Sequence, residues 1–223
     1  MVSRAFVKIM RTAGVRFGVL GNEEKCNCEV ARRVGEEGRF QQAAMELIEL
    51  MNKRGVKKIV TQCPHCFNTF KNEYPRFGAK FEVVHHTQLI SKLIRDGRLR
   101  FKEGKEQSIA FHDPCYLGRY NEEYEAPREI IRTISAGELV ELPRCRAKSF
   151  CCGGGGGNTW YAVGAEKKPS VIRIEEARKV GPSILAAACP YCISMFEDAS
   201  KALGTSESMP IKDIAELVVE ALE

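Results

Sequence analysis

The chain repeats its own cysteine pattern, and this repeat constrains the fold more than any other feature of the sequence. A shift of 126 residues places Cys26 on Cys152, and the Cys-Pro-His-Cys motif at 63–66 on the Cys-Pro-Tyr-Cys motif at 189–192. In both copies, 36 residues separate the first cysteine from the motif that follows. A long internal repeat of this kind indicates that one structural unit has been duplicated.

The two copies share a predicted order of strands and helices. Short apolar runs at 58–61 and 183–187 are typical of buried strands. Each run leads into a Cys-Pro-x-Cys that is expected to open a helix, at 64–74 and 190–203, because proline is well tolerated in a first helical turn. Further helices are expected at about 40–54 and 168–180, and further strands at 15–20, 81–85, 108–112 and 138–142.

Strands that alternate with helices predict an α/β fold, with a small, mostly parallel sheet flanked by helices in each of two tandem repeats. We expect residues 1–106 to form the first repeat and residues 107–223 the second, complete one. The second repeat opens with a strand leading to Cys115, whereas a counterpart of Cys115 would precede Met1. The first repeat is therefore predicted to be truncated at its N-terminus, as in a piece of a longer polypeptide or a chain with a misplaced start.

Five cysteines of the second repeat are expected to converge. The order is Cys115, 35 residues, Cys151 and Cys152, 36 residues, and then Cys189 and Cys192. All five fall at strand ends or in loops before helices, and the carboxyl ends of parallel strands meet at one edge of a sheet. Five thiols exceed the four ligands of a structural zinc, whereas a multi-iron cluster accepts adjacent cysteines on different irons. The pattern therefore favours an iron–sulfur cluster.

The glycine run after the cysteine pair fits the same interpretation. Gly153–Gly157 allow positive φ and a close approach of backbone N–H groups to sulfur, although a flexible loop is the alternative. No Gly-Lys-Ser/Thr follows, which argues against a phosphate-binding loop. A thioredoxin-like dithiol at a Cys-x-x-Cys is a further alternative, but it leaves Cys115, Cys151 and Cys152 without a role.

The first repeat offers a smaller set of cysteines as a candidate metal site. Cys26, Cys63 and Cys66 match positions of the repeat, and Cys28 is additional. Four thiolates can hold a zinc ion or a second cluster. The truncation removes the fifth cysteine of the repeat, so a vestigial site without metal is the alternative.

Several polar side chains near the cysteines have both a structural and a chemical interpretation. His112 is interpreted as a satisfied strand-end histidine or as a hydrogen-bond donor to the cluster. His65 is a candidate ligand, whereas the pair His85–His86 is expected to be structural. The repeat shift aligns Thr87 with Asp213, and we expect each to cap the helix that follows it.

Charge and hydropathy limit the partners and the compartment. Residues 1–107 carry a net charge of +9 and residues 108–223 a net charge of −4. This asymmetry indicates an anionic partner near the first repeat, or only a solvated basic face. No aromatic-interleaved basic motif suggests nucleic acid, and no apolar segment reaches the ~18–20 residues of a membrane span. Ten cysteines are then expected in a cytoplasmic protein, where clustered thiols serve metal or redox chemistry.

These motifs together resemble the cysteine-rich CCG domain. The specific part is the pattern Cys-x35-Cys-Cys-Gly-x35-Cys-x-x-Cys, and the resemblance covers nearly the whole chain. The domain occurs in heterodisulfide reductase, in the iron–sulfur component of glycolate oxidase and in iron–sulfur oxidoreductases linked to electron-transfer flavoproteins. The chain is most similar in its motifs to the last group. The matching stretches are 19–26, 63–69, 71–75, 84–89, 112–119 and 150–153.

The resemblance implies a [4Fe–4S] cluster, noncubane in the heterodisulfide reductase case, held by Cys115, Cys151, Cys152, Cys189 and Cys192. It implies electron transfer to a disulfide or to a quinone-linked acceptor. The implied partners are a ferredoxin-like iron–sulfur subunit and a flavoprotein, and any membrane association would run through such a partner. Against this resemblance, the upstream ferredoxin-like domain that usually feeds electrons in is expected to be missing. A non-enzymatic scaffold subunit that binds zinc or a cluster is therefore the alternative.

Overall fold

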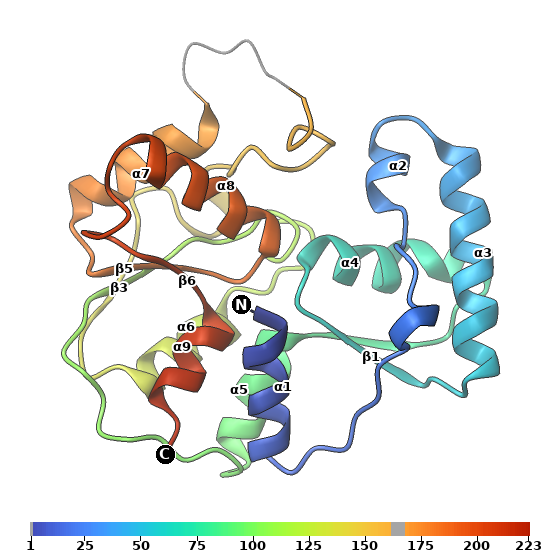
Figure 1. Ribbon diagram of the computed structural model, residues 1–223, viewed down its shortest axis with the longest axis horizontal. Helices are drawn as coiled ribbons and strands as arrows, with labels where there is room; N and C mark the ends of the chain where they lie inside the picture. Colours follow the sequence, from blue (N-terminus) through green and yellow to red (C-terminus); the bar gives the residue numbers. More distant parts are fainter. Residues whose placement is uncertain (1, 162–167) are drawn as a thin grey trace.

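The second half of the chain forms a parallel four-stranded sheet. The computed structural model describes residues 2–161 and 168–223, and Figure 1 shows the arrangement of their helices and strands. Every neighbouring pair of strands in this sheet is parallel. The spatial order is β4 (Leu139–Val140), β3 (Ile109–Phe111), β5 (Ile184–Ala187) and β6 (Ile211–Asp213).

Both faces of this sheet are buried, as is usual for parallel sheets. Ile184 and Ala186 of β5 point into one apolar cluster, whereas Leu185 and Ala187 point into another on the opposite face. The continuous apolar run of β5 therefore serves two helical layers at once. The covering helices are α6 (Glu125–Ile134) and α9 (Ile214–Ala221) on one face, and α7 (Pro169–Val180) and α8 (Pro190–Ala202) on the other.

The first half builds a smaller sheet of two parallel strands, with Thr61 paired to His85 at its carboxyl end. Its own apolar cluster packs Leu47 and Met51 of the long helix α3 against Ile59. The strands are β1 (Lys58–Thr61) and β2 (Glu82–His85). The helical elements are α1 (Val2–Thr12), η1 (Gly21–Glu23), α2 (Glu29–Arg33), α3 (Glu37–Lys53), α4 (Pro64–Asn68), the π-helical turn η2 (Thr69–Glu73), η3 (Tyr74–Phe77) and α5 (His86–Arg95).

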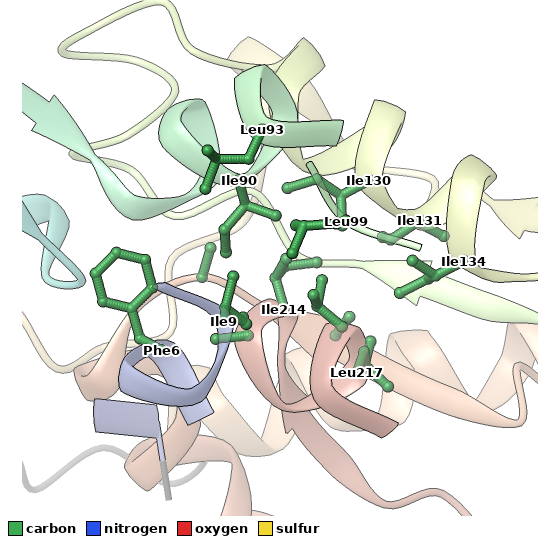
Figure 2. Close-up of a cluster of buried hydrophobic side chains, with 14 of the residues drawn as sticks. Phe6, Ile9, Ile90, Leu93, Leu99, Ile130, Ile131, Ile134, Ile214 and Leu217 are labelled. Atoms are coloured by element: carbon green, nitrogen blue, oxygen red, sulfur yellow. The ribbon is translucent and has the colours of Figure 1, made fainter. Parts of the chain in front are cut away.

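One apolar cluster joins the two halves. Figure 2 shows Phe6 and Ile9 of α1 and Ile90 of α5 beside Ile130 of α6 and Ile214 of α9. Helices of both repeats thus form a shared layer between the two sheets, which Figure 1 shows as α1, α5, α6 and α9 side by side. The predicted division at residues 106 and 107 stays a prediction about the sequence repeat, since this core extends across it.

The predicted fold class is confirmed. Two small parallel sheets flanked by helices correspond to the two repeats. The helix expected at 40–54 is α3, and the helix expected at 168–180 is α7. The helix expected at 64–74 is found as α4 continued by the turn η2.

The strand expected at 15–20 is wrong. This stretch is extended but pairs with no strand among the described residues. Phe17 is 42% exposed and Val19 is 76% exposed, so no neighbouring layer packs against their apolar side chains. Strand propensity alone does not form a strand without a partner edge and a buried face.

The cap expected at Thr87 is also wrong, whereas the cap at Asp213 is confirmed. Asp213 is the N-cap of α9, and its side chain accepts a hydrogen bond from the backbone N–H of Ala215. In the first repeat the N-cap is His85, and Thr87 lies inside the first turn of α5. Since Thr61 pairs with His85 and Ala187 pairs with Asp213, the repeat shift changes from 126 to 128 residues between these strands.

Candidate metal centre

The five cysteines of the second repeat gather at the carboxyl edge of its sheet. Cys115 lies in the turns after β3, and Cys151 and Cys152 follow the short helix η4 (Arg146–Lys148) in the loop after β4. Cys189 is the N-cap of α8, where its extended backbone continues from β5, and Cys192 lies in the first turn. Because β3, β4 and β5 are parallel neighbours, the segments that follow them leave the sheet at the same edge.

The five thiols act on one another's pKa values. The pKa of Cys151 responds to hydrogen bonding with Cys115 and Cys152, and the pKa of Cys192 responds to hydrogen bonding with Cys152 and Cys189. The bond from Cys115, helped by that from Cys152, lowers the pKa of Cys151 to about 2. The same bond, together with burial, raises the pKa of Cys115. Thiols that share protons in this way can carry negative charge, which is the state that binds metal.

Backbone N–H groups of the glycine run donate to the same sulfurs. The N–H of Gly153 lies 3.3 Å from Sγ of Cys151, and the N–H of Gly154 donates to Cys152. Gly153 has a φ of +85°, and a Cβ at this position would lie 3.2 Å from Cβ of Pro169. Glycine is therefore favoured here for two reasons: its backbone adopts a positive φ without strain, and a larger side chain would crowd the first turn of α7.

The donor set suits a multi-iron group better than a single ion. No three Cys, His, Asp or Glu side chains in the described part of the chain are arranged to hold one metal ion. The thiols of the second repeat instead act on one another pair by pair, and all ten cysteines of the chain are free thiols. Thiolates paired in this way can reach different irons of one cluster, whereas a tetrahedral zinc needs four ligands around one point.

The four cysteines of the first repeat also lie together. The N–H of Cys28 lies 3.4 Å from Sγ of Cys26, which matches the contact of Gly154 with Cys152 one repeat later. Cys63 is the N-cap of α4, and a hydrogen bond from Cys66 lowers the pKa of Cys63 to about 6. The charge of Cys26 acts on the pKa of both Cys28 and Cys66.

The two thiol sets face each other through three aromatic rings. The imidazole of His65 lies between the phenol rings of Tyr116 and Tyr191, with ring centroids 4.4 and 4.8 Å away. Tyr116 follows Cys115, and each of the other two rings lies inside a Cys-Pro-x-Cys motif. A Cβ at Gly155 would lie 3.4 Å from Cε1 of His65, so the glycine run of the second repeat also borders the first.

A buried carboxylate lies beside the ring of His65. Nδ1 of His65 lies 3.3 Å from Oε2 of Glu29, which is 3% exposed. Arg33 donates to Glu29 and to Glu73, and its guanidinium lies 5.5 Å from the ring centroid of Tyr116. The sequence motifs do not reveal this cluster, although Glu29 and Arg33 have the i, i+4 spacing of a helical ion pair.

A second buried cluster fixes the loop that carries Cys115. Arg128 is fully buried and donates two hydrogen bonds to Asp113, at 2.7 and 2.9 Å, and two to Glu141. Asp113 also accepts a hydrogen bond of 2.7 Å from the backbone N–H of Arg146, ahead of the cysteine pair. Bidentate guanidinium–carboxylate pairs are geometrically specific, so this network holds two cysteine loops in register.

Other side chains near the cysteines have mostly structural roles. His112 is buried and accepts a hydrogen bond from Arg173, and His85 has the structural role expected of it, as the N-cap of α5. Arg119 donates to the backbone carbonyls of Ser149 and Ala147, which leaves it unsuited to a free anion. Trp160 is 62% exposed and meets the edge of Tyr191, so it covers the surface between the repeats instead of filling a core.

The fold and the cysteines together define a duplicated α/β protein with thiols at the carboxyl edge of each parallel sheet. The model of the CCG cysteine-rich domain family matches residues 1–71 and 109–197. The chain belongs to this family, which confirms the resemblance drawn from its motifs.

Three curated relatives match almost the whole chain. The probable iron–sulfur-binding oxidoreductase FadF of Bacillus subtilis is 42% identical over 221 residues, covering 99% of this chain and 31% of the relative. The EtfAB:quinone oxidoreductase of Syntrophomonas wolfei is 35% identical, covering 100% and 32%. One subunit of the dihydromethanophenazine:CoB–CoM heterodisulfide reductase of Methanosarcina barkeri is 32% identical, covering 96% and 54%.

The chain therefore spans from about a third to about half of the length of these relatives. Within residues 2–161 and 168–223, no helix has both the length and the apolar character needed to cross a membrane.

Proposed function

We propose that this chain is the cluster-binding part of an iron–sulfur oxidoreductase related to heterodisulfide reductase. The observation that carries the proposal is the convergence of five thiols at one sheet edge, where they act on one another's pKa values: Cys115, Cys151, Cys152, Cys189 and Cys192. These residues would hold a [4Fe–4S] cluster, and the resemblance to heterodisulfide reductase favours its noncubane form. When bound, such a cluster supplies one-electron chemistry.

The residues around the thiols suit this role. The N–H groups of Gly153 and Gly154 already donate to sulfur, and such donors stabilise anionic sulfur and tune a cluster's potential. Cys189 opens α8, where the N-terminal end of the helix dipole stabilises negative charge. The ion-pair network of Arg128 and Asp113 keeps the cysteine loops fixed, so little reorganisation accompanies a change of charge.

The names of the relatives support the acceptor class. One relative is an EtfAB:quinone oxidoreductase and another belongs to a heterodisulfide reductase. We infer that this chain passes electrons towards a disulfide or a quinone-linked acceptor, as part of a cytoplasmic or peripherally bound complex. A ferredoxin-like iron–sulfur subunit and a flavoprotein are the proposed partners.

We infer a second, smaller metal site in the first repeat. Cys26, Cys28, Cys63 and Cys66 lie together and carry a thiol with a lowered pKa, which suits a second cluster; zinc is the other candidate and would need these side chains to turn towards one point. The aromatic contact of His65 with Tyr191 brings this set close to the first.

Spectroscopy of the reconstituted chain tests the proposal. The protein is purified anaerobically, reconstituted with iron and sulfide, and titrated with dithionite and with a mild oxidant. We expect visible absorption that bleaches on reduction and an electron paramagnetic resonance signal in one of the two states. A colourless protein that holds only zinc after reconstitution would contradict the redox role and leave the scaffold alternative.

A further inference from the structure

Arg173 of α7 is a buried arginine with an incomplete set of hydrogen-bond partners. Its side chain is fully buried. Nε donates to Nδ1 of His112 at 3.3 Å, and Nη1 donates to Oε2 of Glu176 at 2.7 Å. Nη2 is buried without a hydrogen-bond partner in the part of the chain that the structure describes. A buried guanidinium is costly, so its position calls for a compensating interaction.

The bond to Arg173 fixes the protonation of His112. A guanidinium only donates, so Nδ1 of His112 must be the acceptor and the ring proton must sit on Nε2. Burial, with the charge of Arg173 acting in the same direction, lowers the pKa of His112 well below its usual value. The imidazole is therefore a neutral ring with one defined donor, packed edge-on against Phe196.

His112 stands close to the thiols of the second repeat. It follows β3 directly and precedes Cys115 by three residues, and the charge of Cys151 acts on its pKa. The hydroxyl of Ser149 donates to the backbone carbonyl of Asp113 at 2.9 Å, so the segment that leads into Cys151 lies against the segment that follows His112.

The carboxylate that pairs with Arg173 also pairs with a second arginine. This carboxylate, that of Glu176, is shared with Arg144, which donates to both oxygens at 3.0 and 3.3 Å. Asp113, which follows His112 in the sequence, accepts hydrogen bonds from both Nη atoms of Arg128. Two arginines thus share the carboxylate of Glu176, and the buried one is Arg173.

We propose that Arg173 is a positioning residue for the cysteine site: it holds His112 as the Nε2–H tautomer and places a permanent positive charge against His112, three residues before Cys115. This inference rests on the proposed function. A positive charge near the site favours the more negative, reduced state of a bound cluster, and a fixed N–H donor acts in the same direction. Arg173 therefore raises the reduction potential of the site without touching substrate.

The first test compares reduction potentials in the reconstituted full chain. R173M removes the charge, R173K keeps it, and R144M removes the exposed cation from the same carboxylate without a contact to His112. We expect R173M to reduce the equilibrium constant for one-electron reduction by about tenfold, which is about 59 mV. R173K is expected to stay within about threefold of wild type, and so is R144M. Equal potentials in wild type and R173M would overturn the inference.

The second test needs neither a cluster nor activity. In protein labelled with ¹⁵N-histidine, the His112 signals are assigned by their loss in H112Q. We expect wild type to show a protonated Nε2 and an unprotonated Nδ1, and R173K, which can fold even where R173M does not, to lose the fixed tautomer. A wild-type ring protonated on Nδ1 would overturn the inference. A wild-type chain that takes up no iron and sulfide, but shows the expected tautomer, would instead overturn the proposed function and leave the positioning of His112 standing.

Discussion

The ring of His65 lies 4.8 Å, centroid to centroid, from the ring of Tyr191, and the two residues occupy equivalent positions in the two Cys-Pro-x-Cys motifs. The duplicated units thus meet through the one variable position of their shared motif. Since each ring is flanked by cysteines, the contact sets the spacing of the two thiol sets as well as the packing of the repeats.

The pair is expected to contribute a measurable coupling energy. In a double-mutant cycle of H65L and Y191L, urea unfolding should give an interaction of about 0.5–1.5 kcal/mol, the range for aromatic pairs. The control cycle pairs H65L with M45A, an exposed side chain of α3, and should be additive. Additivity in both cycles would show that the ring contact does not join the repeats.

The loss of the cap of α9 should destabilise the protein. D213A removes the hydrogen bond to the N–H of Ala215 and also the buried partner of His86, 3.2 Å away. We expect a loss of about 1–3 kcal/mol in the free energy of unfolding, because an N-cap contributes about 1 kcal/mol and an unsatisfied buried group adds to it. D198A, on an exposed position of α8, is the control and should change stability by less than about 0.5 kcal/mol. Similar losses in both variants would contradict the role of the cap.

The two predicted helix caps show which features of this fold can be predicted from the sequence. The cap at Asp213 is predictable because its side chain, the capping box and the apolar helix are local signals. The cap at Thr87 is wrong because an insertion of two residues between the strands shifts the repeat, and His85, an unusual cap, takes the position. Local chemistry is visible in a sequence, whereas the length of each connection is not.

The candidate site shows the same division. Parallel strands meet at one edge, so the proximity of Cys115, Cys151 and Cys189 follows from topology alone. Contacts between the repeats, such as that of His65 with Tyr191, depend on how the two repeats pack against each other. The periodicity of the sequence does not predict this packing. Arg173 escapes prediction because a buried cation looks like an ordinary exposed helical arginine until its neighbours are known.

Glu141 should make stability depend on pH. The hydrogen bonds from Arg128 hold the pKa of Glu141 below its usual value of 4.5 in the folded protein. The unfolded chain then binds a proton at higher pH, so the stabilisation is complete above about pH 4.5 and is lost as the pH falls through the lower folded pKa. In urea unfolding between pH 6 and pH 3.5, E141Q should lose less stability than wild type.

The control for this comparison is E197Q, which removes an exposed carboxylate of α8 that has no ion pair in the described part of the chain. It should follow the wild-type dependence on pH. If E141Q and wild type lose the same stability on acidification, the pair with Arg128 does not act on that carboxylate.

Two glycines of the same run separate backbone strain from metal binding. Gly153 and Gly156 both have positive φ, +85° and +65°, but only Gly153 donates to a cysteine sulfur and lies against Pro169. Both G153A and G156A should lose about 1–2 kcal/mol through strain. Only G153A should also lower the iron and sulfide bound per chain, by at least about half. Equal iron contents in the two variants would argue against a role of Gly153 in binding the cluster.

The central claim is that the five cysteines of the second repeat hold an iron–sulfur cluster, and metal analysis of two matched variants tests it most directly. C152S removes a buried thiol of this set, and C145S removes a half-buried thiol outside it. After anaerobic reconstitution, about four irons and four acid-labile sulfides per chain are expected in wild type and in C145S, with most of both lost in C152S. Equal iron and sulfide in C152S and C145S, or zinc alone in wild type, would contradict the account.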